Sequence, residues 1–293
     1  MLSHVIFSGS HIWGFCYIGI IRYMQTYPEK FINVKHVGGV SFGSTIALLI
    51  ALKIPIKEIE DMFYKYSNDN EMKMIEIDNV FNIIENKGMQ DTKKYLKPVI
   101  NYLKSNFDIT DITFIEVSKK FGINLHVSAL CVNDGEVVLF NVDNTPHVSV
   151  IDAVCASISV PIVSTPVSIN KKLYCDPAII ENTLVEYFHD VPKNQILSVI
   201  NKRSDTKLSN NVEQLSTLQY YMNLLHIVEQ KRNYTVAWKY INDYTLIIEN
   251  HDTFVKIEVN DTGINQIFDK ASVDNCIIHG YYSISNWIKK HSM

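Results

Sequence analysis

The stretch Gly39-Val40-Ser41-Phe42-Gly43 decides how this 293-residue sequence is expected to fold. An apolar run of strand length, residues 34–40, leads into it, and an apolar helical run, residues 44–52, follows it. A serine between two glycines at a strand-to-helix junction is the pattern of a nucleophile elbow, where the strained serine backbone leaves no room for neighbouring side chains. The sequence therefore predicts Ser41 as a nucleophile, with Gly39 and Gly43 shaping the turn. The alternative is a tight turn that only requires small residues.

The segments around this stretch alternate between strand and helix patterns. A short apolar strand is expected at residues 2–7, followed by a loop at 8–14 and a helix from residue 15. Further strands are expected at 124–132, 136–141, 172–175, 195–200, 244–249 and 254–259, and helices within 55–106, at 150–157, at about 208–233 and twice near the C-terminus. Such alternation is typical of a single α/β domain with a mostly parallel sheet. We expect a core of about 1–200, with helices and short strands of 205–293 packed on it.

Composition excludes several classes of protein. The chain is 47% hydrophobic and 20% charged, with a formal net charge of −4, as in a globular protein rather than a disordered one. No basic stripe predicts nucleic-acid binding, and no apolar run reaches the roughly 18 residues of a membrane span. The N-terminus lacks the basic region of a signal peptide. Five scattered cysteines without a CxxC pair favour a reducing compartment over a zinc site or a disulfide framework, so we expect a cytoplasmic protein.

Two further segments carry residues suited to acyl-transfer chemistry. The loop Gly9-Ser10-His11-Ile12-Trp13-Gly14 follows the first strand, and its backbone N–H groups are candidate oxyanion donors. Asp176 follows the strand at 172–175, at a sheet end where active-site groups gather. Taken alone, the loop is weak evidence, and an ordinary Asp-Pro turn is the favoured interpretation of the segment at Asp176.

Together these three segments resemble the patatin-like phospholipase family, which combines a glycine-rich oxyanion loop, a GxSxG elbow near the N-terminus and an aspartate in an Asp-Gly-Gly or Asp-Gly-Ala motif. The stretch 152–161 is similar to the family's segment before the aspartate, and Glu181-Asn182-Thr183-Leu184 is similar to its Asn-x-Pro stretch. The resemblance implies a three-layer domain with helices on both faces of a mostly parallel sheet.

The resemblance also implies a mechanism. Ser41 would be the nucleophile and Asp176 the base of a dyad that uses no histidine, and the amides of Gly9, Ser10 and His11 would stabilise the oxyanion. No cofactor or metal is expected. The expected partners are a phospholipid or acyl-ester substrate and a peripheral membrane surface, and no nucleic acid.

The sequence departs from the family pattern in two motifs, which leaves alternatives open. Ser10 and His11 replace usual glycines, Trp13 replaces a usual basic residue, and Pro177 follows the aspartate. These changes are compatible with a catalytically impaired lipid-binding or regulatory protein. A Ser-His-Asp triad would need one of four histidines, at positions 226, 251, 279 and 291. Acyl transfer of the acyl-CoA type is disfavoured because the chain has only three arginines.

Overall fold

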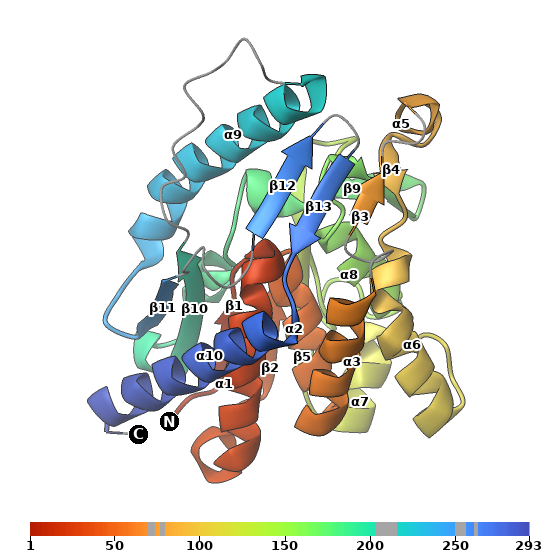
Figure 1. The fold of residues 1–293 in the computed structure, drawn as a ribbon. Helices are drawn as coiled ribbons and strands as arrows, with labels where there is room; N and C mark the ends of the chain where they lie inside the picture. The colour runs from red at the N-terminus through yellow and green to blue at the C-terminus, as the bar shows by residue number, and fades with distance from the viewer. Residues whose placement is uncertain (70–73, 77–79, 203–215, 250–255, 261–262, 293) are drawn as a thin grey trace.

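The chain folds around an eight-stranded sheet (Figure 1). The computed structural model describes residues 1–69, 74–76, 80–202, 216–249, 256–260 and 263–292. Five neighbouring strands run parallel: β11 (Thr245–Glu249), β10 (Ile196–Lys202), β1 (His4–Phe7), β2 (His36–Gly39) and β5 (Asn124–Cys131). Three further strands complete the sheet through antiparallel pairs: β6 (Glu136–Phe140) and β9 (Lys172–Cys175) pair with β5, and β8 (Val167–Ile169) pairs with β9. The expected α/β class with a mostly parallel sheet is confirmed.

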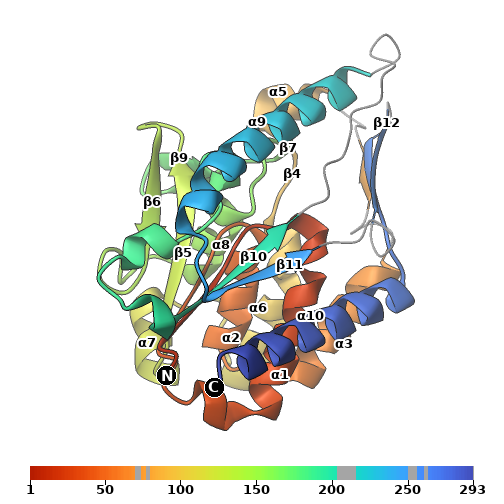
Figure 2. The same ribbon diagram turned by 90° about the vertical axis from the view of Figure 1, so that its left-hand side faces the viewer.

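Alternate residues of each strand point to opposite faces of this sheet, and the two faces have different covers. In β5, Leu125, Val127 and Ala129 enter the main hydrophobic core. The helices that pack on this face are α1 (Phe15–Thr26), α2 (Phe42–Ala51), α3 (Ile56–Asn68), α6 (Lys93–Phe107), α7 (Phe114–Phe121), α8 (Val150–Ser157) and α10 (Lys270–Lys290) (Figure 2). The other face is covered by short 3-10 helices instead, η3 (Pro177–Ile179) and η4 (Val185–Phe188), which form a smaller core with Ile6 and Ile196.

The candidate site is positioned by two strands, β2 and β9, that pair with the same edge of β5. β2 runs parallel to β5 and ends with Gly39 opposite Val127. β9 runs antiparallel along the same edge and ends with Cys175 opposite Leu130. The strands therefore approach each other end to end, so the residues that follow them, Ser41 and Asp176, meet in the gap between their ends.

A long helix and two small sheets lie at the carboxyl end of the parallel strands (Figures 1 and 2). The helix α9 (Thr217–Tyr240) contacts η3 and the strand β12 (Lys256–Asn260). β12 pairs with β13 (Gly263–Ile267), which pairs with β3 (Met74–Glu76). The second small sheet is β4 (Gly88–Gln90) with β7 (Ile162–Ser164). The remaining described helices are α5 (Val80–Asn86), η1 (His11–Gly14), η2 (Pro28–Phe31) and η5 (Lys193–Gln195).

The expectation of two helices at the C-terminal end is wrong. A strand, β13, comes first, and one helix, α10, then runs from Lys270 to Lys290. This helix continues through Gly280, normally an unfavourable residue inside a helix, because the glycine packs against the backbone of Cys16 in α1. The helix expected at about 208–233 begins at Thr217 within the described residues, while residues 203–215 lie outside them.

Candidate functional site

The elbow has the strained geometry that its sequence predicts. Ser41 lies between β2 and α2 with φ 51° and ψ −129°, a conformation that costs a non-glycine residue about 1–3 kcal/mol. A side-chain carbon on Gly39 would lie 2.1 Å from the carbonyl of Gly43, and one on Gly43 would lie 2.5 Å from the carbonyl oxygen of Ser8. Both positions therefore require glycine. The Ser41 N–H donates to Oγ of Ser157 at 2.9 Å, which helps to hold the strained turn.

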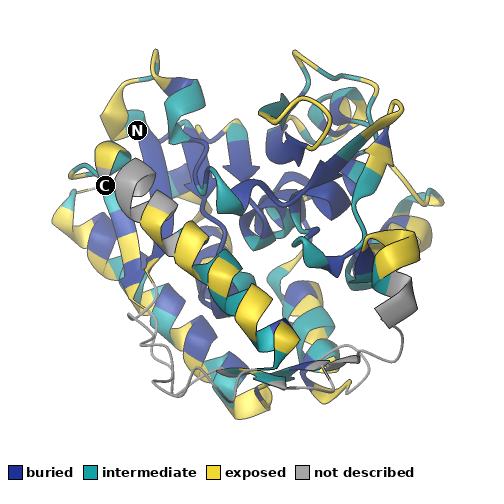
Figure 3. Cartoon of the chain, turned by 90° about the horizontal axis from the view of Figure 1, so that it is seen from above, coloured by how far each residue is buried: buried dark blue, intermediate teal, exposed yellow. Residues whose placement is uncertain are grey.

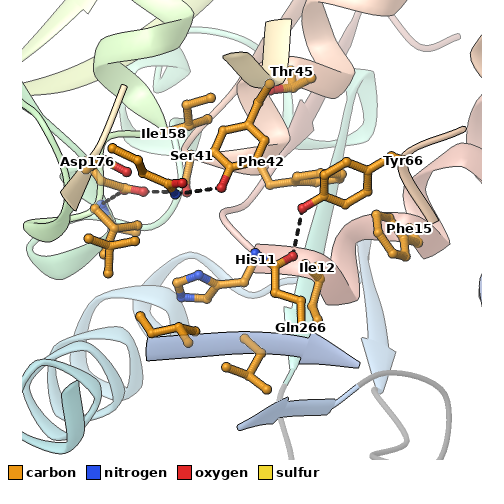
Figure 4. A pocket seen from close by; sticks show the side chains of 18 of the residues that line it. His11, Ile12, Phe15, Ser41, Phe42, Thr45, Tyr66, Ile158, Asp176 and Gln266 are labelled. Atoms are coloured by element: carbon orange, nitrogen blue, oxygen red, sulfur yellow. Dashed lines mark hydrogen bonds between the residues drawn. The ribbon is translucent and has the colours of Figure 1, made fainter. Parts of the chain in front are cut away.

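Ser41 and Asp176 form a direct hydrogen bond at the centre of the site (Figure 4). The Ser41 Oγ donates to Oδ2 of Asp176 at 2.5 Å, and both side chains are buried. The other carboxylate oxygen, Oδ1, accepts from the N–H of Ala178 at 2.9 Å. The carboxylate is thus oriented with one oxygen toward the serine hydroxyl.

Pro177 fits this arrangement although glycine is usual at its position. It occupies the first position of η3, where the missing N–H would have no helical partner. Asp176 caps this short helix, and the capping bond comes from Ala178 rather than from residue 177. The replacement therefore removes no hydrogen bond from the carboxylate.

The environment of Asp176 makes it a stronger base than an exposed aspartate. Burial raises its pKa to about 6, because removal from water penalises the charged form. The hydrogen bonds from Ser41 and Ala178 act in the opposite direction. The carboxylate is consequently ionised at neutral pH. Its pKa of about 6 is still close enough to neutral pH for the carboxylate to accept a proton during a reaction.

The loop between β1 and α1 lies against Ser41. A side chain on Gly9 would meet Oδ1 of Asn182 at 2.4 Å and Cβ of Ser41 at 3.1 Å, so a larger residue there would displace the Asn182 side chain and crowd Ser41. Ser10 has a negative φ of −154° with ψ −1°, whereas His11 has a positive φ of 49°. His11 therefore adopts the left-handed backbone conformation that a glycine would favour, and its side chain does not prevent that geometry. Within the described part of the chain, the N–H groups of Gly9 and Ser10 donate no hydrogen bond to another protein group.

An apolar cavity of about 530 Å³ opens beside Ser41, within the usual range for small-molecule sites. Its walls come from α2, α3, α6, the loop after α8, and the small sheet of β12 and β13. Most lining side chains are aliphatic or aromatic, among them Phe15, Phe42, Phe63, Leu96 and Val163. A polar pair, Tyr66 O–H to Oε1 of Gln266 at 2.8 Å, lies on the opposite wall from Asp176 (Figure 4). The cavity can hold a hydrocarbon chain with one reactive end at the serine.

Polar residues of α9 face the same cavity, and of these the sequence indicates only His226, as the histidine of an alternative triad. Gln219, Asn223, His226 and Glu229 line it. The Oε2 atom of Glu229 lies 3.6 Å from Nε2 of His11 and 3.9 Å from Nδ1 of His226. The helical spacing of these four residues is the only signal in the sequence that could have placed them on one face.

The structure assigns the candidate triad histidines to other interactions. His226 lies near Glu229, while the Ser41 hydroxyl is bonded to Asp176. His279 bonds to the backbone oxygen of Glu249 and His291 to those of Trp287 and Asp243. His251 lies outside the described residues.

Within the residues that the structure describes, no group of three or more His, Cys, Asp or Glu side chains is arranged to bind a metal ion. None of the helices described there combines the length and the apolar character needed to cross a bilayer.

Comparison with known proteins adds two similarities. An uncharacterized protein of Acanthamoeba polyphaga mimivirus is 26% identical over 192 residues, which cover 64% of this chain and 62% of that protein. The chain thus spans less than two thirds of the length of this curated relative. The crystal structure of VipD from Legionella pneumophila superposes with a TM-score of 0.64 at 14% identity, over 99% of this chain and 67% of VipD. At that identity the similarity establishes the fold.

The family model for the patatin-like phospholipases matches residues 5–189. The match covers well over half of the 293 residues and includes the loop at Gly9, the elbow at Ser41 and Asp176. The chain therefore belongs to the patatin-like phospholipase family.

Proposed function

We propose that this protein is a serine acyl hydrolase that cleaves acyl esters of lipids through a Ser41–Asp176 dyad. The observation that carries the proposal is the 2.5 Å bond from the Ser41 hydroxyl to the buried Asp176 carboxylate, beside an apolar cavity. A nucleophile, a base within hydrogen-bond reach and a site for the substrate are the components that ester cleavage requires.

Acylation would begin when Asp176 accepts the proton of the Ser41 hydroxyl as Oγ attacks the ester carbonyl carbon. The carbonyl oxygen becomes an oxyanion, which the N–H groups of Gly9 and Ser10 and the positive N-terminal end of α2 would stabilise. The N–H of His11 is a further candidate donor from the same loop. Collapse of this intermediate transfers the proton from Asp176 to the leaving alcohol and leaves an acyl group on Ser41. Water deprotonated by Asp176 would then release the fatty acid and restore the serine.

The cavity favours a long acyl chain over a polar substrate. Its lining side chains are mostly aliphatic or aromatic, and burial of each CH₂ group contributes about 0.8 kcal/mol. A phospholipid or another lipid ester is therefore the proposed substrate class, in agreement with the membership of the family.

A fluorophosphonate probe and a hydrolysis assay test the proposal together. The parent protein should form a covalent adduct and hydrolyse p-nitrophenyl esters and phospholipid, and Ser41→Ala should do neither. Ser164→Ala is the matched control, because Ser164 is also buried and lines the same cavity. The control should keep both properties.

The opposite result has a specific meaning. If the folded parent protein neither reacts with the probe nor hydrolyses esters, the site is catalytically inactive. The lipid-binding alternative raised by the altered loop would then replace the proposed function.

A further inference from the structure

The helix α9 has an unusual distribution of polar and apolar residues. Its inner face, toward the cavity, carries Gln219, Asn223, His226 and Glu229 among the cavity-lining residues. Its outer face carries Tyr220, Tyr221, Leu224, Ile227 and Val228, all 37–54% exposed. A helix on the surface of a globular protein normally directs its apolar residues inward. On α9 apolar residues lie on both sides: Leu218, Met222 and Leu225 face inward, and a second apolar stripe faces solvent.

The spacing of the exposed residues makes this stripe continuous. The other four exposed residues follow Tyr220 after one, four, seven and eight positions, which places all five on one side of an α-helix. The two tyrosines lie at the N-terminal end of the stripe, and the exposed Lys231 extends the same face at the other end. In Figure 3, α9 crosses the molecule obliquely with exposed residues along its outer side.

We propose that this outer face of α9 is the surface by which the protein docks on a lipid bilayer. Aliphatic side chains flanked by tyrosine and lysine, without an acidic residue on the face, suit the boundary between lipid headgroups and acyl chains. The stripe consists of five side chains, whereas a stable interface with a second protein copy needs roughly 20–30 residues on each side. A bilayer needs only the shallow insertion of such a stripe.

The position of α9 connects docking with the cavity. The same helix presents the apolar stripe on one side and lines the cavity beside Ser41 with its other side. A lipid that leaves the bilayer beneath α9 would therefore reach the cavity without crossing an extended water layer. This inference deepens the proposed function and rests on it for the identity of the substrate, while the docking itself does not require turnover.

Vesicle flotation tests the proposal, with vesicles of phosphatidylcholine and phosphatidylserine and all variants made on a Ser41→Ala background. The double variant Leu224→Gln/Val228→Gln should lower the bound fraction at least tenfold. Ile278→Gln/Tyr282→Gln on α10 is the matched control, because it removes two exposed apolar residues at the same four-residue spacing. The control should bind like the parent. Equal loss in both doubles, or no binding by the parent, would overturn the proposal.

A second measurement avoids dependence on the stability of the double variant. All five cysteines are buried, so Leu224→Cys can be labelled selectively with an environment-sensitive fluorophore. We expect a blue shift on addition of vesicles at position 224 and none for Ile278→Cys. If light scattering instead shows a dimer that Leu224→Gln/Val228→Gln dissociates, and no blue shift occurs, the face binds a second copy and the proposal fails.

Assays on the Ser41 protein separate this inference from the proposed function. Hydrolysis of soluble p-nitrophenyl butyrate should be unchanged in Leu224→Gln/Val228→Gln, while hydrolysis of vesicle phospholipid should fall in parallel with binding. Vesicle binding through α9 without any ester hydrolysis would contradict the proposed function and leave the docking surface in place. Hydrolysis of vesicles that the substitutions leave unchanged would contradict the docking surface alone.

Discussion

Under the proposed mechanism, chemistry and stability make opposing demands on Asp176. Its carboxylate is buried beside Ser41, where burial raises the pKa to about 6. Because an unfolded aspartate ionises at a lower pH, keeping the charge at pH 7.5 destabilises the folded state. Asparagine at this position could accept from Ala178 and donate to Ser41 without a charge. Asp176→Asn should therefore lower turnover roughly 10²–10⁴-fold and raise the free energy of unfolding by about 1–3 kcal/mol.

The exposed Asp134, which bonds to Lys172, is the control for Asp176→Asn. Asp134→Asn should leave turnover unchanged, and urea unfolding should show no gain in stability. The value of kcat/KM for the parent should rise as pH increases through about 6 and then level off, since the proposed dyad requires an ionised Asp176. An active Asp176→Asn together with an inactive, folded His226→Ala would identify a triad and contradict the dyad.

His11 shows how a loop can keep a glycine-like backbone without glycine. Its φ of 49° costs about 1–2 kcal/mol, which glycine would not incur. Glycine loses about 0.5–1 kcal/mol of backbone entropy, so the two effects nearly cancel. We expect His11→Gly to change the free energy of unfolding by at most about 1 kcal/mol and to preserve or raise turnover.

Ser10→Gly provides the comparison for His11→Gly, because Ser10 has a negative φ of −154° and glycine would relieve no left-handed backbone there. It should only destabilise the protein, by about 0.5–1 kcal/mol, in the same urea titration. A loss of turnover above tenfold in His11→Gly alone would indicate that the imidazole takes part in the reaction.

Among the helices and strands, those with strong local patterns were predictable, whereas strands whose pairing depends on distant partners were not. The elbow, the helix at 150–157 and the strand at 172–175 are found as the sequence predicts. The three-residue strands β3 and β4 fall in a region expected to be helical, because distant partners rather than local spacing determine their pairing. The contact of Ser41 with Asp176 depends on β2 and β9 sharing one edge of β5, and no local pattern reports that register.

The packing of α1 on α10 depends on glycines in both helices. A side-chain carbon on Gly280 would lie 1.8 Å from the backbone oxygen of Cys16, and one on Gly19 would lie 2.0 Å from that of Ile277. Helix propensity alone predicts that Gly280→Ala stabilises the protein by about 1 kcal/mol. Overpacking should reverse that sign and give a net destabilisation of about 1–3 kcal/mol.

Thermal and urea unfolding of Gly280→Ala distinguish these two effects. Ser283→Ala, one turn further along α10, should stay within about 0.5 kcal/mol of the parent. A stabilised Gly280→Ala would show that the two helices can move apart without loss.

Over the whole molecule, the two faces of the sheet differ in their response to acid. The main core is apolar, while the second face holds three neighbouring histidines, His4, His36 and His126, on three adjacent strands. The His4 and His36 rings stack at 4.3 Å, and Nδ1 of His36 lies 3.0 Å from Nε2 of His126. Burial lowers the pKa of His4 to about 4 and the pKa of His126 to about 3, and the neighbouring histidines contribute to both shifts. The pKa of His36 is lowered too, by burial.

These histidines should make the fold sensitive to mild acid. Their unfolded pKa is about 6.5, so below that pH the unfolded chain binds protons that the folded protein excludes. The contribution of these neutral histidines to the free energy of unfolding is therefore complete above pH 6.5 and is lost as the pH falls toward 4. Urea titrations at pH 7.5 and at pH 5.5 measure this loss. Between the two pH values, the free energy of unfolding of His126→Gln should fall by about 1 kcal/mol less than that of the parent. Comparing the two proteins cancels the opposite contribution of Asp176, and the exposed His189→Gln should follow the parent. Equal losses in the parent and His126→Gln would show that His126 is protonated in the folded protein.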